Sequence, residues 1–293
     1  MQGKHVAITG PTAGIGRATA LELARRGASL SLLCRDPAKG RALQAEIAGF
    51  AARPELVIMD MASLAGVRKA AEAILSQHRP LDVLLNNAGV VNSSRQVSAD
   101  GFEETFAVNH LAPFLLTGLL LPMLQKADRA RIVNVASDAH SFVRGLGWDD
   151  MQAERSYKTF REYGRSKLAN ILFTRELARR LEGTAITANC LHPGAVATSL
   201  GTNNGPLGRI VMALLKPFIR SPERGAETSI YLCASSEVAD TNGGYFVNCR
   251  EQQPRPWALD DSEAARLWDY SEKCTGFTYP LYNRFIHCAR CYE

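Results

Sequence analysis

The sequence predicts one doubly wound α/β domain, with helices flanking a parallel sheet of about seven strands. Short apolar runs alternate six times with longer segments whose apolar residues recur at helical spacing. No linker-like stretch interrupts this alternation, and 293 residues suffice for one large domain with a substantial core. We expect the domain to span residues 1–277, followed by a tail, 278–293, whose structure the pattern leaves unknown.

Composition and charge are those of an ordinary globular protein, with 46% hydrophobic residues and a net charge of +5. No run of Lys or Arg stands out, so nucleic acid is not expected as a partner. The seven cysteines are scattered, which indicates reduced thiols and no metal site. Cys288 and Cys291 form a lone C-x-x-C, for which a frayed tail is favoured over a metal or redox role.

The ends of the chain and its apolar stretches favour a cytoplasmic protein. The strand-like run His5–Thr9 begins almost at Met1, which leaves no room there for a signal peptide or a membrane anchor. The leucine-rich stretch 111–124 contains two prolines and falls short of a membrane span.

The first strand runs directly into a glycine-rich turn and then a helical pattern. Gly10 allows a sharp turn, whereas Gly14 and Gly16 leave room for a pyrophosphate to approach the backbone. The start of the helix supplies N–H donors and the positive end of a dipole to the phosphates. Strand, turn and helix together are typical of a Rossmann-type dinucleotide site, with a turn of no function as the alternative.

The second strand, Leu30–Cys34, ends where such a site meets the adenosine ribose. An acid there bonds the 2′-hydroxyl of NAD, whereas an arginine accommodates the 2′-phosphate of NADP. Arg35 comes first, and Arg17 and Lys39 are further positive candidates, so the pattern favours NADP(H). The adjacent Asp36 keeps NAD as the less favoured cofactor, and a solvated basic loop is the remaining alternative.

Polar residues follow the next strands. The strand 56–59 ends at Asp60, and the strand 83–85 runs into two amides, an alanine and a glycine, which suits a ligand crevice. The helical region 102–126 contains Asn109, a poor helix former for which a role is inferred, and His110, for which a packed or exposed histidine is favoured over a catalyst. The fifth strand, 131–136, ends at Ser137, and the irregular segment 138–155 is expected to loop over the site.

The run Ser156–Arg180 predicts a helix that carries Tyr163 and Lys167 four residues apart, on one face. An ammonium beside a phenol favours phenolate and lowers the tyrosine pKa from its usual value of about 10. The pair could give or take a proton where carbonyl and alcohol interconvert. Alone, Tyr-x-x-x-Lys is a weak signal, and a solvated helix face is the alternative.

The last third of the chain continues the same alternation. A sixth strand, 186–191, leads into Pro193 and Gly194, and the expected elements after it are helix 223–234, strand 245–247 and helix 261–274. Between them, Leu207–Ile219 is an apolar and basic helix candidate. A substrate lid is favoured there over an oligomer contact or a membrane-binding surface.

Taken together, these motifs resemble the short-chain dehydrogenase/reductase family over about Lys4–Phe277. The order of the glycine turn, the Asn86–Gly89 tetrapeptide, Asn109, Ser137, Tyr163 with Lys167, and Pro193–Gly194 carries the resemblance. Shorter matches are similar to its retinol dehydrogenase-like branch: Cys34–Asp36, Val108–Leu111, Ser166–Asn170 and His192–Gly194.

The resemblance implies a role for each motif. Tyr163 would be the acid or base, and Lys167 would bind the nicotinamide ribose and lower the tyrosine pKa. Ser137 would bond the substrate oxygen, and Asn109 would hold a water in the proton relay. The implied cofactor-binding residues are Gly10, Thr12, Gly14, Ile15, Gly16, Arg35, Lys39, Asp60, Met61, Asn87, Ala88, Gly89, Tyr163, Lys167, Pro193, Gly194, Val196 and Thr198.

We therefore expect an NADP(H)-preferring oxidoreductase that acts on the carbonyl or alcohol of a lipophilic small molecule, of the retinoid, steroid or aliphatic aldehyde class. The apolar lid candidate and the branch resemblance motivate the lipophilic substrate. A catalytically silent NADP(H)-binding regulator or scaffold of the same fold is the alternative. The resemblance also allows a homodimer or tetramer, and Leu207–Arg220 allows peripheral membrane contact.

Overall fold

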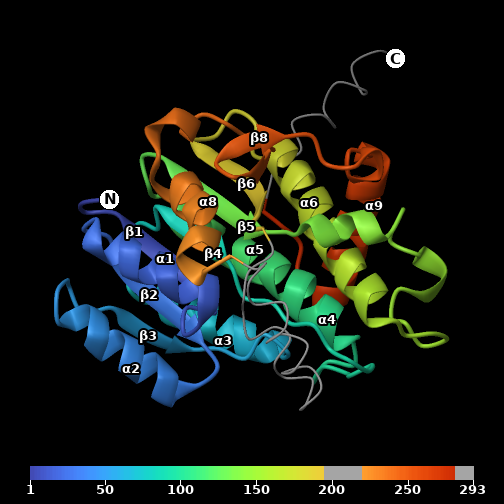
Figure 1. Ribbon diagram of the computed structural model, residues 1–293, viewed down its shortest axis with the longest axis horizontal. Helices are drawn as coiled ribbons and strands as arrows, with labels where there is room; N and C mark the ends of the chain where they lie inside the picture. The colour runs from blue at the N-terminus through green and yellow to red at the C-terminus, as the bar shows by residue number, and fades with distance from the viewer. Residues whose placement is uncertain (195–219, 281–293) are drawn as a thin grey trace, which may run out of the picture.

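The computed structural model describes residues 1–194 and 220–280 (Figure 1). In these ranges eight strands form one sheet, in the order β3-β2-β1-β4-β5-β6-β7-β8. The first seven pair in parallel, and β8 runs antiparallel to β7. The strand order reverses between β1 and β4, and in open α/β sheets ligands bind at such a point, outside the carboxyl ends of the strands.

The seven predicted strands are present, and the doubly wound fold is confirmed. Their bounds are β1 His5–Thr9, β2 Ser29–Cys34, β3 Glu55–Ile58, β4 Val83–Asn86, β5 Ala130–Val135, β6 Ile186–His192 and β7 Tyr245–Val247. The eighth, β8 (Arg250–Gln252), is a short edge strand that the sequence pattern did not predict. A two-residue turn joins it to β7, with Asn248 and Cys249 both at positive φ.

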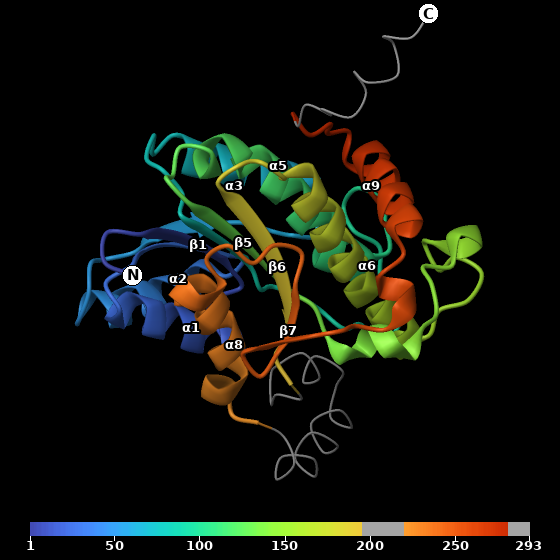
Figure 2. The ribbon, with the colours of Figure 1, turned by 90° about the horizontal axis from the view of Figure 1, so that it is seen from above.

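Helices cover both faces of the sheet. On one face lie α1 (Gly14–Arg25), α2 (Pro37–Ala48) and α8 (Pro222–Ala234). On the other lie α3 (Leu64–Leu75), α5 (Ala112–Leu124) and α6 (Thr159–Arg180), and α9 (Asp261–Thr275) packs outside α6. Figure 2 shows the two layers from above.

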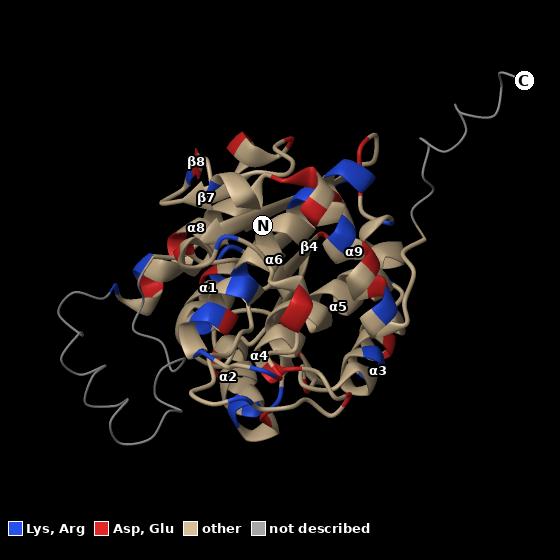
Figure 3. Cartoon of the chain, turned by 90° about the vertical axis from the view of Figure 1, so that its right-hand side faces the viewer, with Lys and Arg blue, Asp and Glu red and all other residues tan. Residues whose placement is uncertain are grey.

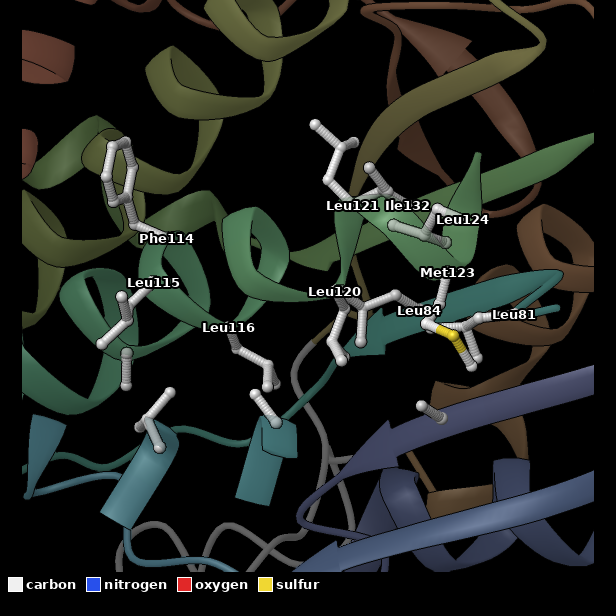
Figure 4. Packing of buried hydrophobic residues seen from close by; sticks show 14 of the residues in the cluster. Leu81, Leu84, Phe114, Leu115, Leu116, Leu120, Leu121, Met123, Leu124 and Ile132 are labelled. Atoms are coloured by element: carbon white, nitrogen blue, oxygen red, sulfur yellow. The ribbon is translucent and has the colours of Figure 1, made fainter. Parts of the chain in front are cut away.

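The sheet is buried on both faces because successive strand residues point to opposite sides. In β4, Leu84 packs with α5, whereas Val83 and Leu85 pack toward α1 and α8. Helix α5 fills one layer with leucine side chains that reach β4 and β5 (Figure 4). It carries no charged residue, while the outer helices carry charges of both signs (Figure 3). The apolar runs read from the sequence are therefore strands and helices of one core.

One helical stretch in the described part of the chain, Glu104–Leu124, is long and apolar enough to cross a membrane. However, 89% of its most apolar window is buried inside the protein, which is typical of a core helix. The stretch comprises α4 (Glu104–Phe106), a π-helical turn η1 (Ala107–Leu111) and α5. The predicted long helix is thus present, and Asn109 lies in its π turn. Such turns occur frequently at functional sites.

The chain remains packed beyond α9. Tyr279 is 5% exposed, its hydroxyl donates to the carbonyl of Phe114 at 2.5 Å, and its ring lies 4.5 Å from that of Trp268. Phe277 and Tyr279 lie so close over Gly118 that a Cβ at that position would collide with both rings. The packed chain therefore extends two residues further than the sequence pattern indicated.

Candidate active site

A cleft lies at the carboxyl ends of β1 to β5, at the reversal of strand order. It brings together most of the residues that the sequence singled out. Those on its wall are Gly10, Thr12, Gly14, Ile15, Gly16, Arg35, Lys39, Asp60, Met61, Asn87, Ala88, Gly89, Tyr163, Lys167 and Pro193. The dinucleotide motif and the Tyr163–Lys167 pair, more than a hundred residues apart in sequence, thus face one cavity.

The glycine turn is fixed against the loop that follows β4. The side-chain amide of Asn87 donates to the carbonyls of Thr9 (2.9 Å) and Gly10 (3.2 Å). The Thr9 hydroxyl accepts from the backbone N–H groups of Asn87 and Ala88, both at 2.9 Å. A Cβ at Gly16 would collide with the Gly10 carbonyl and the Asn87 amide. This glycine therefore allows the two loops to lie side by side.

The start of α1 fits a pyrophosphate. Its N-cap residue, Ala13, makes no side-chain capping bond, and it lies on the cleft wall. The helices α2, α3, α8 and α9 are each capped by a side chain, whereas the N-cap residue of α6, Lys158, makes no such bond either. Within the described residues, the first N–H groups of α1 are thus left to a ligand, and the helix dipole favours an anionic one.

The residues proposed to select the cofactor lie at the end of β2 and the start of α2. Asp36 is the N-cap of α2 and accepts from the backbone N–H groups of Ala38 (2.9 Å) and Lys39 (3.1 Å). The bond from Lys39 is the main cause that lowers the pKa of Asp36. Arg35 is exposed on the cleft wall, whereas Arg17 donates to both oxygens of Glu46 at 2.6 Å on the outer surface. Arg35 and Lys39 line the cleft together with Asp36, and the Lys39 ammonium lies 3.7 Å from the Asp36 carboxylate.

Helix α6 places Tyr163 and Lys167 one turn apart, with the ammonium nitrogen 5.6 Å from the centre of the phenol ring. Lys167 is 3% exposed and donates to the carbonyl of Val135 at 2.9 Å. Burial lowers the pKa of Lys167 to about 8. Burial also raises the pKa of Tyr163, and a hydrogen bond with Ser137 opposes that rise. Burial is the larger of these two effects, and the expectation that Lys167 lowers the tyrosine pKa stays a prediction.

Asn109 is fully buried and connects the β4 loop to α6. Its amide donates to the Val90 carbonyl (3.0 Å) and the Ser166 hydroxyl (2.9 Å), and its oxygen accepts from the Val90 N–H at 2.7 Å. Because both amide hydrogens are used, the side chain holds the site together. The relay water stays a prediction. His110 packs against Phe106 and Phe173, and burial lowers its pKa to about 3, so of the packed and exposed alternatives the structure has the packed one.

Comparison with known proteins identifies the family. The family model for short chain dehydrogenases matches residues 4–206. The chain belongs to the short-chain dehydrogenase family. Human retinol dehydrogenase 14 is 44% identical to this dehydrogenase, over 94% of this chain and 87% of that protein. The resemblance to the retinol dehydrogenase-like branch is thus confirmed.

Solved structures agree with the family assignment. An uncharacterized protein from Mycobacterium paratuberculosis is 33% identical to this dehydrogenase, with a TM-score of 0.76 and 96% of each chain covered. Pseudomonas aeruginosa RhlG, solved with NADP, is 25% identical, with a TM-score of 0.67 over 84% of this chain and 94% of that one.

The remaining predicted positions of this dehydrogenase lie beside the cleft or outside the described residues. Ser137 follows the cleft residue Ala136, and Gly194, at φ +85°, lies against the side chain of Arg220. Within residues 1–194 and 220–280, no cluster of three His, Cys, Asp or Glu side chains could hold a metal ion. The positions outside the described residues are Val196, Thr198, Leu207–Ile219, Cys288 and Cys291.

Two residues between Tyr163 and Lys167 hold the site of this dehydrogenase together, and the sequence assigned neither of them a role. The Ser166 hydroxyl donates to the Tyr163 carbonyl at 2.8 Å and accepts from Asn109. Gly164 lies where α6 meets the 3-10 helix η2 (Asp138–Phe142), and a Cβ there would lie 2.6 Å from the Ala139 carbonyl oxygen. The only sequence signal is that both residues are small and adjacent to a candidate catalytic side chain.

We expect Gly164→Ala to lower kcat by roughly 10- to 100-fold, because the methyl group must push α6 away from η2 and so separate Tyr163 from Ser137. Steady-state kinetics with an NADPH titration would check this, since binding at the glycine turn should persist. Gly145→Ala is the matched control, because a Cβ there meets no atom within 4 Å. Unchanged kcat in Gly164→Ala would show that this close approach does not position the pair.

Proposed function

We propose that this dehydrogenase interconverts the carbonyl and the alcohol of a lipophilic small molecule, with NADP(H) as cofactor and Tyr163 as acid or base. Family membership makes it an oxidoreductase of the alcohol and carbonyl class. One observation carries the finer proposal: the uncapped start of α1 and the Tyr163–Lys167 pair face the same cleft.

NADP(H), when bound, supplies the hydride chemistry. Ser137 would donate its hydroxyl hydrogen to the substrate oxygen, because its Oγ already accepts from the Ala139 N–H at 3.2 Å. Burial raises the pKa of Tyr163, so its phenol is protonated at neutral pH and can donate to the same oxygen. Lys167 would hold the nicotinamide ribose beside Tyr163.

The preference for NADP(H) rests on the charges at the end of β2. Asp36, the acid that would bond the ribose hydroxyl of NAD, is used to cap α2. Arg35 and Lys39 line the cleft and can donate to a 2′-phosphate. The complex of the relative RhlG with NADP supports the same choice.

We expect Arg35→Ala to weaken NADPH binding about 10- to 100-fold, the loss of a hydrogen bond between charged groups, with little change for NADH. Fluorescence titration of the protein with each nucleotide measures this difference. Arg17→Ala is the matched control, because its guanidinium pairs with Glu46 away from the cleft. Equal losses for both nucleotides would remove Arg35 from phosphate recognition.

The proposal of a lipophilic substrate rests on the similarity to known relatives, because the apolar lid candidate lies outside the described residues. Human retinol dehydrogenase 14 is among these relatives, and retinoid, steroid and aliphatic aldehyde classes all stay open. A panel of such carbonyls with NADPH would test the proposal. Turnover of small polar sugars or acids alone would contradict it, and NADPH binding without any turnover would favour the regulator or scaffold. Membrane contact through Leu207–Arg220 stays a prediction that liposome flotation would test.

A further inference from the structure

A buried histidine lies directly behind Ser137. His140, in η2, is 2% exposed, and its ring packs edge-on against Tyr245 with the ring centres 5.5 Å apart. Its Nδ1 lies 2.8 Å from the Ser137 carbonyl oxygen, and its Nε2 lies 3.2 Å from the backbone nitrogen of Arg255. The ring thus bridges the end of β5 and a segment more than a hundred residues later.

The partners fix the protonation of this ring. A carbonyl only accepts, so Nδ1 must carry the hydrogen that bonds Ser137. A backbone N–H only donates, so Nε2 must be the acceptor for Arg255. The neutral Nδ1–H tautomer satisfies both, whereas a second proton on Nε2 would face another donor. Burial lowers the pKa of His140 and Arg255 adds to that effect, while Ser137 and Asp138 oppose it. His192 also faces this ring.

The segment that contains Arg255 makes a second hydrogen bond to η2. The indole N–H of Trp257 donates to the His140 carbonyl at 3.2 Å, so Arg255 and Trp257 both hold η2. Ser137 begins η2, and its hydroxyl accepts from the Ala139 N–H at 3.2 Å. Its carbonyl is held by the ring of His140 and its hydroxyl by the first turn of the same short helix. The positions of the Ser137 carbonyl and of its hydroxyl therefore both depend on the position of η2.

We propose that His140 is a positioning residue for Ser137, and that its neutral ring couples this serine to the segment Pro254–Trp257. The inference rests on the proposed function, in which Ser137 contacts the substrate oxygen. His140 is not on the wall of the cleft that contains Tyr163 and Lys167, so it would act through the serine. Sub-ångström placement of a donor to the reacting oxygen has a large effect on rate, so losing this bridge should reduce kcat far more than cofactor binding.

Two variants test the hydrogen bonds of the two ring nitrogens separately. His140→Asn keeps an amide N–H near the Nδ1 position and can still donate to Ser137, whereas His140→Gln keeps an acceptor near Nε2 for Arg255. We expect His140→Gln to lower kcat roughly 10- to 100-fold and His140→Asn by less than about fivefold, with the Kd for NADPH unchanged in both. Equal loss of kcat in the two variants, in proportion to their loss of melting temperature, would overturn the inference.

Combining each variant with Ser137→Ala tests whether His140 acts through the serine. In that background His140→Gln should have no further effect on kcat, because the positioned hydroxyl is gone, and an additive loss would overturn the inference. Full activity of Ser137→Ala alone would instead contradict the proposed function. His5→Asn is the matched control: His5 is also buried and bonded at both nitrogens, to Pro80 and Ser31, but it lies at the amino-terminal end of β1, opposite the cleft. It should lower the melting temperature and leave kcat unchanged.

Discussion

Replacing Tyr163 with Phe is expected to lower kcat by about 10²- to 10⁴-fold, the usual contribution of a positioned acid or base. The change removes one oxygen atom and keeps the ring that lies against Lys167. Because the glycine turn and the start of α1 are untouched, NADPH should bind as in the unmodified protein. Steady-state kinetics and a fluorescence titration on the same preparation would measure the two effects separately.

Tyr157→Phe is the control for that experiment. Tyr157 lies just before the same helix, and its hydroxyl donates to the Asn92 carbonyl at 2.8 Å. Tyr157→Phe removes the same oxygen atom as Tyr163→Phe, but from a phenol whose hydrogen bond is structural, so kcat should change little. If Tyr163→Phe kept full activity, the proton would have to come from another group and the proposed role of Tyr163 would be refuted.

Gly16→Ala is expected to weaken NADPH binding more than about 100-fold and to destabilise the fold by about 1–3 kcal/mol. Its methyl group would collide with the Gly10 carbonyl and the Asn87 amide, which together hold the glycine turn against the β4 loop. The Gly10 backbone or the Asn87 side chain must move, and the glycine turn that would hold the pyrophosphate moves with it. Isothermal titration with NADPH and a thermal melt would measure both effects.

Gly145→Ala again provides the comparison, since that position has open space around it. A variant Gly16→Ala that bound NADPH normally would show that the cofactor does not lie against this turn. That result would also weaken the proposed function, because the uncapped helix start and the turn form one surface.

Much of the fold follows from the sequence because parallel strands buried on both faces are nearly continuous apolar runs. Val83–Leu85 is such a run, with its residues divided between the two layers. The site is predictable for a related reason. Residues just after parallel strands meet at one edge of the sheet, so Gly10, Asn87 and Ser137 come together although they are far apart in sequence.

Other features give little sequence signal. β8 consists of three exposed polar residues, which have no apolar period to detect. The residues of the π turn at Asn109 do not differ in composition from those of an ordinary helix, so the turn cannot be recognised in the sequence. Asp36 followed by Pro37 is a recognisable helix start, and it could have indicated that the carboxylate caps α2 rather than binding a ribose.

Electrostatics is where the sequence was least informative. The spacing of Tyr163 and Lys167 predicts that they are neighbours, but not how deeply they are buried or which oxygen the ammonium bonds. That oxygen belongs to Val135, on a strand 32 residues earlier. The bridge from His140 to Arg255 spans 115 residues, and only the packed chain shows it.

The position of Tyr279 has a consequence for synthesis of the chain. Its ring lies over Gly118, and its hydroxyl bonds helix α5, the central helix of one core layer. Domains emerge from the ribosome with the N-terminal part first and fold as units. The face of α5 at Phe114 and Gly118 therefore stays uncovered until residue 279 has left the ribosome. Nascent chains stalled before this residue should be captured by chaperones that bind apolar segments.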